Sequence, residues 1–515
     1  MNAAATRRNA PRRTTRQASY LVLLALFASI VIPSHLWLAR LPYYWDEAGQ
    51  FVPSALDILR GGHLIPHSTI HPPLVLAYLA GVWRIFGFYP TVTHTAMLVL
   101  SCFGMLAAFL LAIELSQEAR GGPAFLAVAL LCVSPVFFVE SGLAQLDAPA
   151  MLFTTVALLF FLQDRIPLAA AACVALVLSK ETGVVVPLVF AAWMARERRW
   201  RDAAWFIFPT AALAAWIGVL THFTGYWGGD RDFVRYNLFY PLHPVRLLFA
   251  LPRRLYFLFI ANFHWIGTLA IVAAWRTSRL FHNRRWKIAW LLVAAHVVML
   301  TLLGGAVLNR YLLPVLPVVF AAMAAALSLV PRTMRVAATC VLLTGLAASN
   351  WINPPYPFPF EDNLSFADFL KLHADAADYV QHWLLDSLVT TAWPMTAELS
   401  QPDLGFVERG IGVEAMPNLA PQTLETLDWS RVQVLVLFSR DWDPPLNLMR
   451  SVPLRGFWQR FFHFVPSASA EEARLRVPFP AAVHFERRGQ WVDVYVNPAI
   501  RIPVPPAHVA GVQTQ

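Results

Sequence analysis

Two adjacent carboxylates lie at the end of a long apolar run near the start of the chain. The segment LPYYWDEAGQFV at 41–52 carries Asp46 and Glu47, and it follows an apolar run from about 20 to 39. Moving a carboxylate toward hydrocarbon is costly, and acidic side chains at that depth are rare unless the protein uses them. The pair therefore indicates a functional site at the mouth of a predicted membrane span.

A histidine and a third carboxylate occupy comparable positions further along the chain. His71 precedes two prolines, which fix the backbone where a helix begins, and it could bind a phosphate or a metal. His63 and His67 are nearby, but we interpret the three histidines as polarity at an interface rather than as a zinc site. Asp147, in LAQLDAPA, begins another apolar run. Capping of a helix would explain Asp147 as well as a substrate-site role.

Two cationic positions could bind an anion. Lys180 is one of only three lysines in the chain and stands with Glu181 between two short apolar runs. It could contact a phosphate or form a buried ion pair with Glu181. Arg310 and Tyr311 begin a late apolar run. Because a guanidinium binds phosphate through a planar two-donor fork, Arg310 could bind a phosphate. Snorkelling toward lipid headgroups is the alternative for Arg310.

The elements that carry these residues are predicted membrane spans. The chain is 57% hydrophobic and 14% charged, and apolar stretches of about 17–25 residues, each long enough to cross a bilayer core of about 30 Å, recur to about position 350. The net charge of +9 comes mostly from arginines beside these stretches. It indicates topology and contact with anionic lipid rather than nucleic acid. The cysteines all fall within apolar runs and define no disulfide or metal framework: Cys102, Cys132, Cys173 and Cys340.

About eleven helices are predicted to cross the membrane. A further apolar run at 72–88 is ambiguous, and counting it as a span would turn the basic loops at 196–201 and 276–287 outward. The positive-inside rule therefore favours an in-plane or re-entrant segment at 72–88. The predicted spans lie near 20–39, 92–114, 122–140, 146–163, 166–180, 183–195, 202–222, 254–275, 287–307, 310–330 and 333–350.

This topology gathers the ionisable residues at one face of the membrane. Residues 1–19 form a basic cytoplasmic N-terminus before a retained signal anchor, and the first extracytoplasmic loop covers 40–91. Ionisable groups collected at one membrane face suggest a shared water-accessible cavity. We expect this cavity to be extracytoplasmic in the inner, or plasma, membrane. The residues that it would bring together are Asp46, Glu47, His71, Asp147, Lys180, Glu181 and Arg310.

The composition changes after the last predicted span. A link rich in proline and aromatic residues at 353–363 leads into a segment of soluble composition. Helical spacing at 366–384 and apolar stretches at 387–393, 432–438 and 490–496 predict one helix and three short strands. Residues 351–515 are therefore predicted to form a small extracytoplasmic α/β domain behind a transmembrane domain at 20–350.

Four sequence blocks carry a resemblance to a known superfamily. They are YYWDEAGQFVPSALDILRGGHLIPHSTIHPPL, AQLDAPAMLFT, LSKETG and NRYLLPVLP. In this order they resemble the signatures of the GT-C glycosyltransferases that use polyprenyl-phosphate sugars, among them protein mannosyltransferases and the bacterial aminoarabinose transferase of lipid A. The resemblance covers roughly 20–330. Some relatives carry Glu-Lys before the two prolines, whereas this chain has Ile70 and His71.

The resemblance implies a role for each candidate residue. Asp46 would be the general base for an acceptor hydroxyl, Glu47 would orient Asp46 or hold a metal, and Asp147 would belong to the substrate site. The donor phosphate would be bound by His71, Lys180, Arg310 and Tyr311. A phosphate leaving group needs cations more than it needs an acid, and the sequence supplies them. The aromatic loop at 223–253 is a possible lid.

The expected function is transfer of a sugar from a polyprenyl-phosphate donor to an acceptor on the extracytoplasmic face. The acceptor could be a lipid, a glycan or a protein, and membrane lipids are further partners. A divalent cation is a possible cofactor, although the absence of the Glu-Lys pair leaves metal dependence open, and no organic cofactor is expected. The alternative function is that of a flippase or another transporter, against which stand the one-sided charges and the absence of visible repeats.

Overall fold

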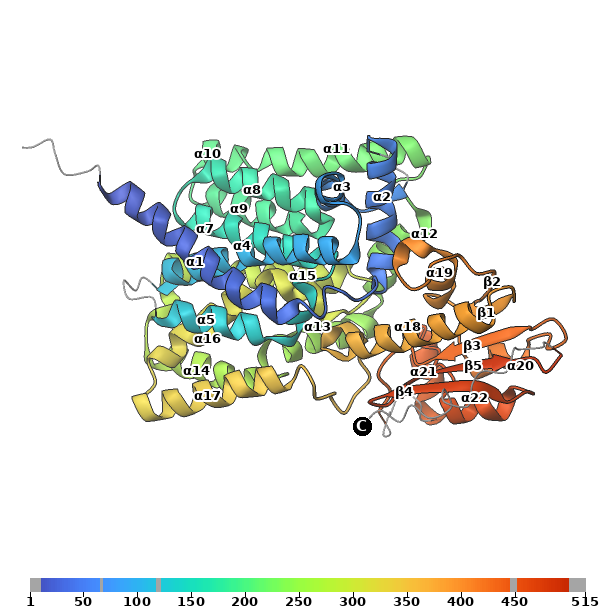
Figure 1. Cartoon of the computed structure of the whole chain (residues 1–515). Helices are drawn as coiled ribbons and strands as arrows, with labels where there is room; N and C mark the ends of the chain where they lie inside the picture. Colours follow the sequence, from blue (N-terminus) through green and yellow to red (C-terminus); the bar gives the residue numbers. More distant parts are fainter. Residues whose placement is uncertain (1–10, 65–67, 117–121, 445–451, 500–515) are drawn as a thin grey trace, which may run out of the picture.

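The chain folds into a bundle of apolar helices joined to a smaller α/β domain (Figure 1). The computed structural model describes residues 11–64, 68–116, 122–444 and 452–499. The central helix of the bundle is α16 (Leu316–Ser328), in which every side chain from Leu316 to Leu327 is buried. A helix that is apolar on all sides is buried in the core of a bundle.

The other long bundle helices pack around α16 and one another. In Figure 1 most of them run side by side across the view, toward the sheet of the second domain. Four described helical stretches are long and apolar enough to cross a membrane, or five if one bent pair is counted as a span. The prediction of about eleven spans is not reproduced by this criterion and stays a prediction. Besides α16 and the bent pair described below, the bundle contains nine longer helices and the two short helices α6 and α10: α1 (Pro11–His35), α4 (Pro90–Ser116), α5 (Gly122–Val133), α6 (Pro135–Glu140), α7 (Asp147–Leu162), α8 (Ile166–Ser179), α9 (Val185–Arg196), α10 (Trp200–Ala204), α11 (Ile207–Thr224), α15 (Arg284–Leu303) and α17 (Arg332–Ala348), among the described residues.

One predicted span is not a single helix. The segment expected at 254–275 contains the end of α13 (Pro244–Phe259) and most of α14 (His264–Thr277), which meet at 87°. Asn262 and Phe263 adopt positive φ angles of 51° and 67° between the two helices, a conformation that a continuous helix does not contain. The bend turns α13 away from the direction of α14, so the apolar run at 254–275 is not one straight helix, and its crossing of the membrane stays a prediction.

Two short helices of the first loop run across the bundle. In Figure 1, α2 (Val52–Gly61) is nearly perpendicular to α4, and α3 (Leu74–Phe86) is seen almost end on. With 13 residues, α3 is about 20 Å long, which is shorter than a hydrocarbon core of about 30 Å. Its length and direction favour the prediction that 72–88 does not cross the membrane.

The C-terminal domain is built on one mixed sheet. Its five strands have the order β2-β1-β3-β5-β4, in which β1 pairs in parallel with β2 and β3, and β5 pairs antiparallel with β3 and β4. The predicted strands are β1 (Val389–Ala392), β3 (Val434–Phe438) and β5 (Gln490–Val496), and the predicted helix is α18 (Ser365–Trp383). The strands β2 (Val413–Met416) and β4 (Ala481–Arg487) were not predicted. The short helices are α19 (Met395–Ser400), α20 (Pro421–Glu425), α21 (Val452–Phe462) and α22 (Ala470–Arg476).

The α/β domain packs directly on the first loop. Tyr44 contacts Phe366 and Phe369 of α18 edge to face, with ring centroids 5.7 Å apart in both pairs. The ring of Trp45 lies 4.5 Å from that of Trp393. One continuous apolar core includes side chains of this loop, of α3 and of the C-terminal sheet. The domain therefore helps to fix the loop that carries the acidic pair.

Candidate active site

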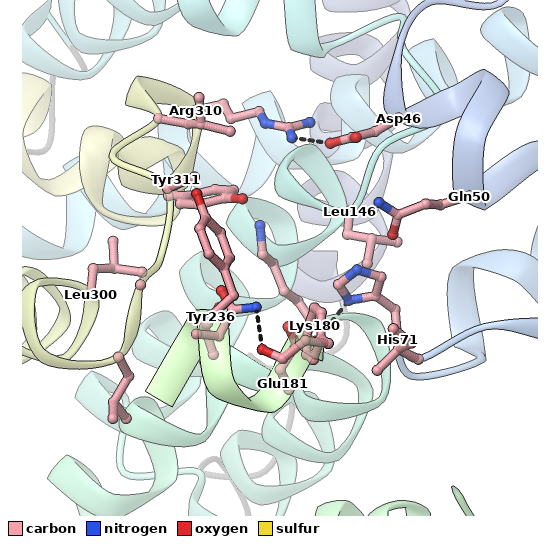
Figure 2. A pocket seen from close by; sticks show the side chains of 18 of the residues that line it. Asp46, Gln50, His71, Leu146, Lys180, Glu181, Tyr236, Leu300, Arg310 and Tyr311 are labelled. Carbon is pink, nitrogen blue, oxygen red and sulfur yellow. Dashed lines mark hydrogen bonds and ion pairs between the residues drawn. The ribbon is translucent and has the colours of Figure 1, made fainter. Parts of the chain in front are cut away.

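Six of the seven predicted site residues line one cavity. The cavity has a volume of about 870 Å³ and is lined by residues of the first loop, the bundle and the α/β domain. Figure 2 shows the part of its lining that comes from the first loop and the bundle. Its walls come from segments that are hundreds of residues apart in the sequence, which only the fold brings together. The predicted residues that line it are Asp46, His71, Asp147, Lys180, Arg310 and Tyr311.

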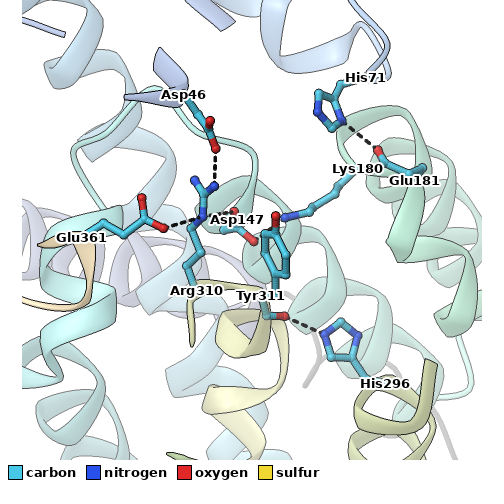
Figure 3. Close-up of polar contacts among 9 residues, drawn as sticks. All are labelled: Asp46, His71, Asp147, Lys180, Glu181, His296, Arg310, Tyr311 and Glu361. Atoms are coloured by element: carbon cyan, nitrogen blue, oxygen red, sulfur yellow. Dashed lines mark hydrogen bonds and ion pairs between the residues drawn. The ribbon is translucent and has the colours of Figure 1, made fainter. Parts of the chain in front are cut away.

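Arg310 is the cation with the most acidic neighbours in this cavity. It belongs to a 3₁₀ turn (Asn309–Val315) at the start of α16, and it is only 3% exposed. One guanidinium nitrogen, Nη2, donates a hydrogen bond to Asp46. Nε lies 3.1 Å from a carboxylate oxygen of Glu361 and 4.0 Å from one of Asp147. Figure 3 shows the guanidinium between Asp46 and Glu361.

The backbone beside Arg310 is fixed from inside the bundle. His296 of α15 is buried, and its Nε2 lies 2.9 Å from the carbonyl oxygen of Tyr311 (Figure 3). The ring N–H can donate to this carbonyl, whose partner in the 3₁₀ turn would be Pro314, which has no N–H. The contact holds the turn that presents Arg310 and Tyr311 to the cavity.

Lys180 pairs with Asp147 rather than with Glu181. Its Nζ lies 2.5 Å from Oδ1 of Asp147, and both side chains are almost fully buried. The same ammonium lies 4.3 Å from the centre of the Tyr311 ring. The ion pair with Glu181 that the sequence left open is therefore replaced by one with a residue 33 positions away.

His71 and Glu181 form a second pair on the opposite wall. Nδ1 of His71 lies 3.2 Å from a carboxylate oxygen of Glu181, and the His71 ring packs against Phe51 and Phe233. Burial opposes ionisation of Glu181, but the neighbouring His71 outweighs it, so that the pKa of Glu181 is lowered to about 2. The carboxylate is thus ionised at neutral pH and holds the imidazole at the cavity edge.

Glu47 does not line the cavity. It is fully buried, and its two oxygens accept hydrogen bonds from the backbone N–H groups of Tyr44, at 2.8 Å, and Ala144, at 2.5 Å. Nε2 of His94 lies 3.2 Å from the same carboxylate. Glu47 thereby connects the loop that carries Asp46 with the segment that leads to Asp147.

Glu361 is a cavity residue that sequence reasoning missed. It belongs to a short 3₁₀ turn (Phe360–Asp362) in the link between the two domains. Burial raises the pKa of Glu361 to about 7, against the opposing effect of Arg310. The only signal in the sequence was an acidic pair in a link rich in aromatic residues, and nothing there pointed to Arg310.

A large part of the cavity wall is apolar. The predicted lid region at 223–253 contributes to this wall, together with α11 and α15. The region is largely helical, with the short helix α12 (Arg231–Val234) and a π-helical turn (Arg235–Phe239) before α13. The apolar lining from these elements includes Leu213, Trp216, Leu220, Trp227, Phe233, Met299, Leu300 and Leu303.

Among the described residues, no group of three or more histidine, cysteine, aspartate or glutamate side chains is arranged to hold a metal ion. His63 is exposed and lies outside the cavity. His67 falls outside the described residues.

The fold is similar to that of known glycosyltransferases. ArnT from Cupriavidus metallidurans bound to undecaprenyl phosphate aligns with a TM-score of 0.52 at 13% identity, over 96% of this chain and 100% of ArnT. The apo state of ArnT gives the same TM-score over 97% of this chain. AglB from Archaeoglobus fulgidus, in complex with an inhibitory peptide and a dolichol-phosphate, aligns with a TM-score of 0.48 at 12% identity, over 96% of this chain and 75% of AglB.

No protein family and no curated protein matches at the level of sequence. The similarity is therefore one of three-dimensional structure, and it confirms the fold that the resemblance of the four sequence blocks implied. The chain has the fold of ArnT, a GT-C glycosyltransferase.

Proposed function

We propose that this protein is an integral membrane glycosyltransferase that moves a sugar from a polyprenyl-phosphate donor to an acceptor on the extracytoplasmic face. The observation that carries the proposal is the convergence of Asp46, Lys180 and Arg310 on one cavity with a large apolar wall. The GT-C fold supports it, because ArnT, which shares the fold, was solved with undecaprenyl phosphate.

The donor phosphate would bind at the two cations. Arg310 offers a planar fork of N–H donors and Lys180 a compact charge, and both side chains are almost fully buried. Buried cations stabilise an anion more strongly than cations in water do, because the local dielectric is lower. The polyprenyl chain would lie along the apolar wall formed by α11, α15 and the 223–253 region.

The reaction exchanges one bond at the anomeric carbon. The oxygen of an acceptor hydroxyl forms a bond to this carbon while the bond between the carbon and the phosphate oxygen breaks. Asp46 takes the hydroxyl proton, which as general-base catalysis contributes about 10²–10⁴-fold. The electron pair of the broken bond stays on the polyprenyl phosphate, and Arg310 and Lys180 stabilise its charge. The acceptor itself would be a lipid, a glycan or a protein.

The test is incubation of the purified protein in liposomes with a polyprenyl-phosphate sugar labelled in the sugar. A glycosyltransferase releases the labelled sugar from the lipid, either to an added envelope extract or slowly to water. A flippase changes only the leaflet in which the intact donor lies. Movement of intact donor without any cleavage would overturn the proposal in favour of the transporter alternative.

A further inference from the structure

Two acids of the interdomain link hold the turn that carries Arg310. Oδ2 of Asp362 accepts a hydrogen bond of 2.6 Å from the side-chain amide of Asn309. Oε1 of Glu361 lies 3.1 Å from Nε of Arg310. Asp362 and Glu361 thus contact Asn309 and Arg310, respectively. The link into the α/β domain therefore lies beside the proposed phosphate site.

The contact between Glu361 and Arg310 joins two buried side chains. Both side chains are 4% exposed, but Nε of Arg310 has no aligned hydrogen-bond acceptor among the described residues. The carboxylate therefore acts on Arg310 through short-range attraction, and the two buried side chains also pack against each other, a contact that a side chain of the same shape keeps. Asp46 engages the other edge of the guanidinium, so Arg310 lies between two acids (Figure 3).

We propose that Glu361 is a positioning residue of the donor-phosphate site, which holds the guanidinium of Arg310 in the cavity and whose charge opposes binding of the donor phosphate. The proposal rests on the proposed function. It gives the link into the C-terminal domain a direct part in donor binding.

The charge of Glu361 changes near neutral pH. Burial raises its pKa to about 7, Arg310 opposes this shift, and Asp46, Asp362 and Asp147 add to it. Below pH 7 the carboxyl of Glu361 is mostly protonated and does not compete with a phosphate for Arg310. Above pH 7 the carboxylate partly neutralises Arg310 and repels the anionic donor. A phosphodiester donor does not itself titrate in this range, so donor binding should weaken as pH rises through 7.

The experiment must distinguish the titration of Glu361 from the effects of other charged groups around this turn. Asp362 also has a pKa raised to about 7, because it is buried. Glu140 of α6 acts on Arg310 from within the bundle. Asp368 of α18 pairs with Arg488 instead. His71, on the far wall, and His463 are the imidazoles among the described cavity residues.

The experiment compares donor KM and kcat at pH 6, 7 and 8 for the full-length protein in liposomes. For the wild type we expect donor KM to rise up to about tenfold from pH 6 to 8, because the neutral fraction of a group with a pKa of about 7 falls about tenfold over this range. Glu361→Gln removes the charge and keeps the shape and the packing against Arg310, so its donor KM at pH 6, 7 and 8 should stay near the value of the wild type at pH 6. Glu361→Ala removes the contact, and kcat/KM at pH 6 should fall at least about tenfold because Arg310 is no longer held.

Matched controls identify the titrating group. Asp362→Asn removes the adjacent buried carboxyl that contacts Asn309, and it should keep most of the pH response. His71→Gln should keep the ratio of KM values between pH 6 and 8, even if donor affinity falls. A Glu361→Gln variant whose KM still rises like that of the wild type would overturn the inference. Absence of donor cleavage in the wild type would instead overturn the proposed function.

Discussion

At the scale of single residues, Asp46 combines a position at the cavity with a cationic partner. Its carboxylate pairs with Arg310, and its 20% exposed side chain can meet an acceptor. Asp46→Asn keeps the size of the side chain but cannot take the proton. We expect turnover to fall by about 10²-fold or more, while donor affinity is kept or raised because one negative charge beside Arg310 is removed. The measurement is single-turnover transfer alongside donor binding; near-normal turnover would assign the base to another residue, with Asp147 the next candidate.

Lys180 and Asp147 form a buried pair. Its contribution to stability can be separated from the proposed binding of the donor phosphate by Lys180. Lys180→Met leaves the carboxylate of Asp147 buried without its partner, which should cost about 3–5 kcal/mol of stability. In the double variant Lys180→Met, Asp147→Asn, no unpaired charge remains, so the thermal midpoint in detergent should recover. Turnover should stay low in the double variant, because the donor phosphate still lacks the ammonium. Recovery of both stability and turnover would make the pair purely structural.

At the scale of elements, Glu47 connects the first loop to the segment that precedes α7. Its carboxylate accepts two backbone N–H groups, from Tyr44 and Ala144. In Glu47→Gln, the amide NH₂ would face one of these donors, and leaving a buried donor unsatisfied costs about 1–3 kcal/mol. We expect a lower thermal midpoint and a reduced kcat, with donor KM nearly unchanged. Asp57→Asn, a partly exposed carboxyl on α2, is the control that should leave both quantities near wild type. A parallel loss in both variants would remove the specific role of Glu47.

Periodicity and apolar length predicted the elements better than they predicted the contacts. Apolar runs predicted the positions of most bundle helices because burial in a bundle or in lipid requires continuous apolar sequence. The bend between α13 and α14 was missed because it depends on two residues at positive φ, which no apolar run reveals. Six of the seven site residues were placed at one cavity by a topology argument. Glu361 was missed, and the partner of Lys180 was not identified, because such contacts join distant segments.

At the scale of the whole molecule, the α/β domain is part of the site rather than an appendage. It shares an apolar core with the first loop, and its link supplies Glu361 to the cavity. The short helix α10, which borders the basic 196–201 loop, lies at the opposite end of the bundle (Figure 1). This separation is what the positive-inside rule requires if the cavity faces outward.

The orientation can be tested with single cysteines in a cysteine-free background. We expect Gly61→Cys, Tyr89→Cys and Arg409→Cys to react with an impermeant maleimide in intact cells, or in spheroplasts if there is an outer membrane. Arg201→Cys, on α10, should react only after permeabilisation. Tyr89 is preferred to Gly87 because it is 64% exposed, whereas Gly87 has a φ of 83° and a side chain there would meet Tyr89. Residues before and after α3 in the sequence are then labelled from one side of the membrane, as expected for a helix of about 20 Å that does not cross it. Labelling of Gly61→Cys without Tyr89→Cys would instead make α3 a span, reverse every later helix and place Lys180 and Arg310 on the cytoplasmic side.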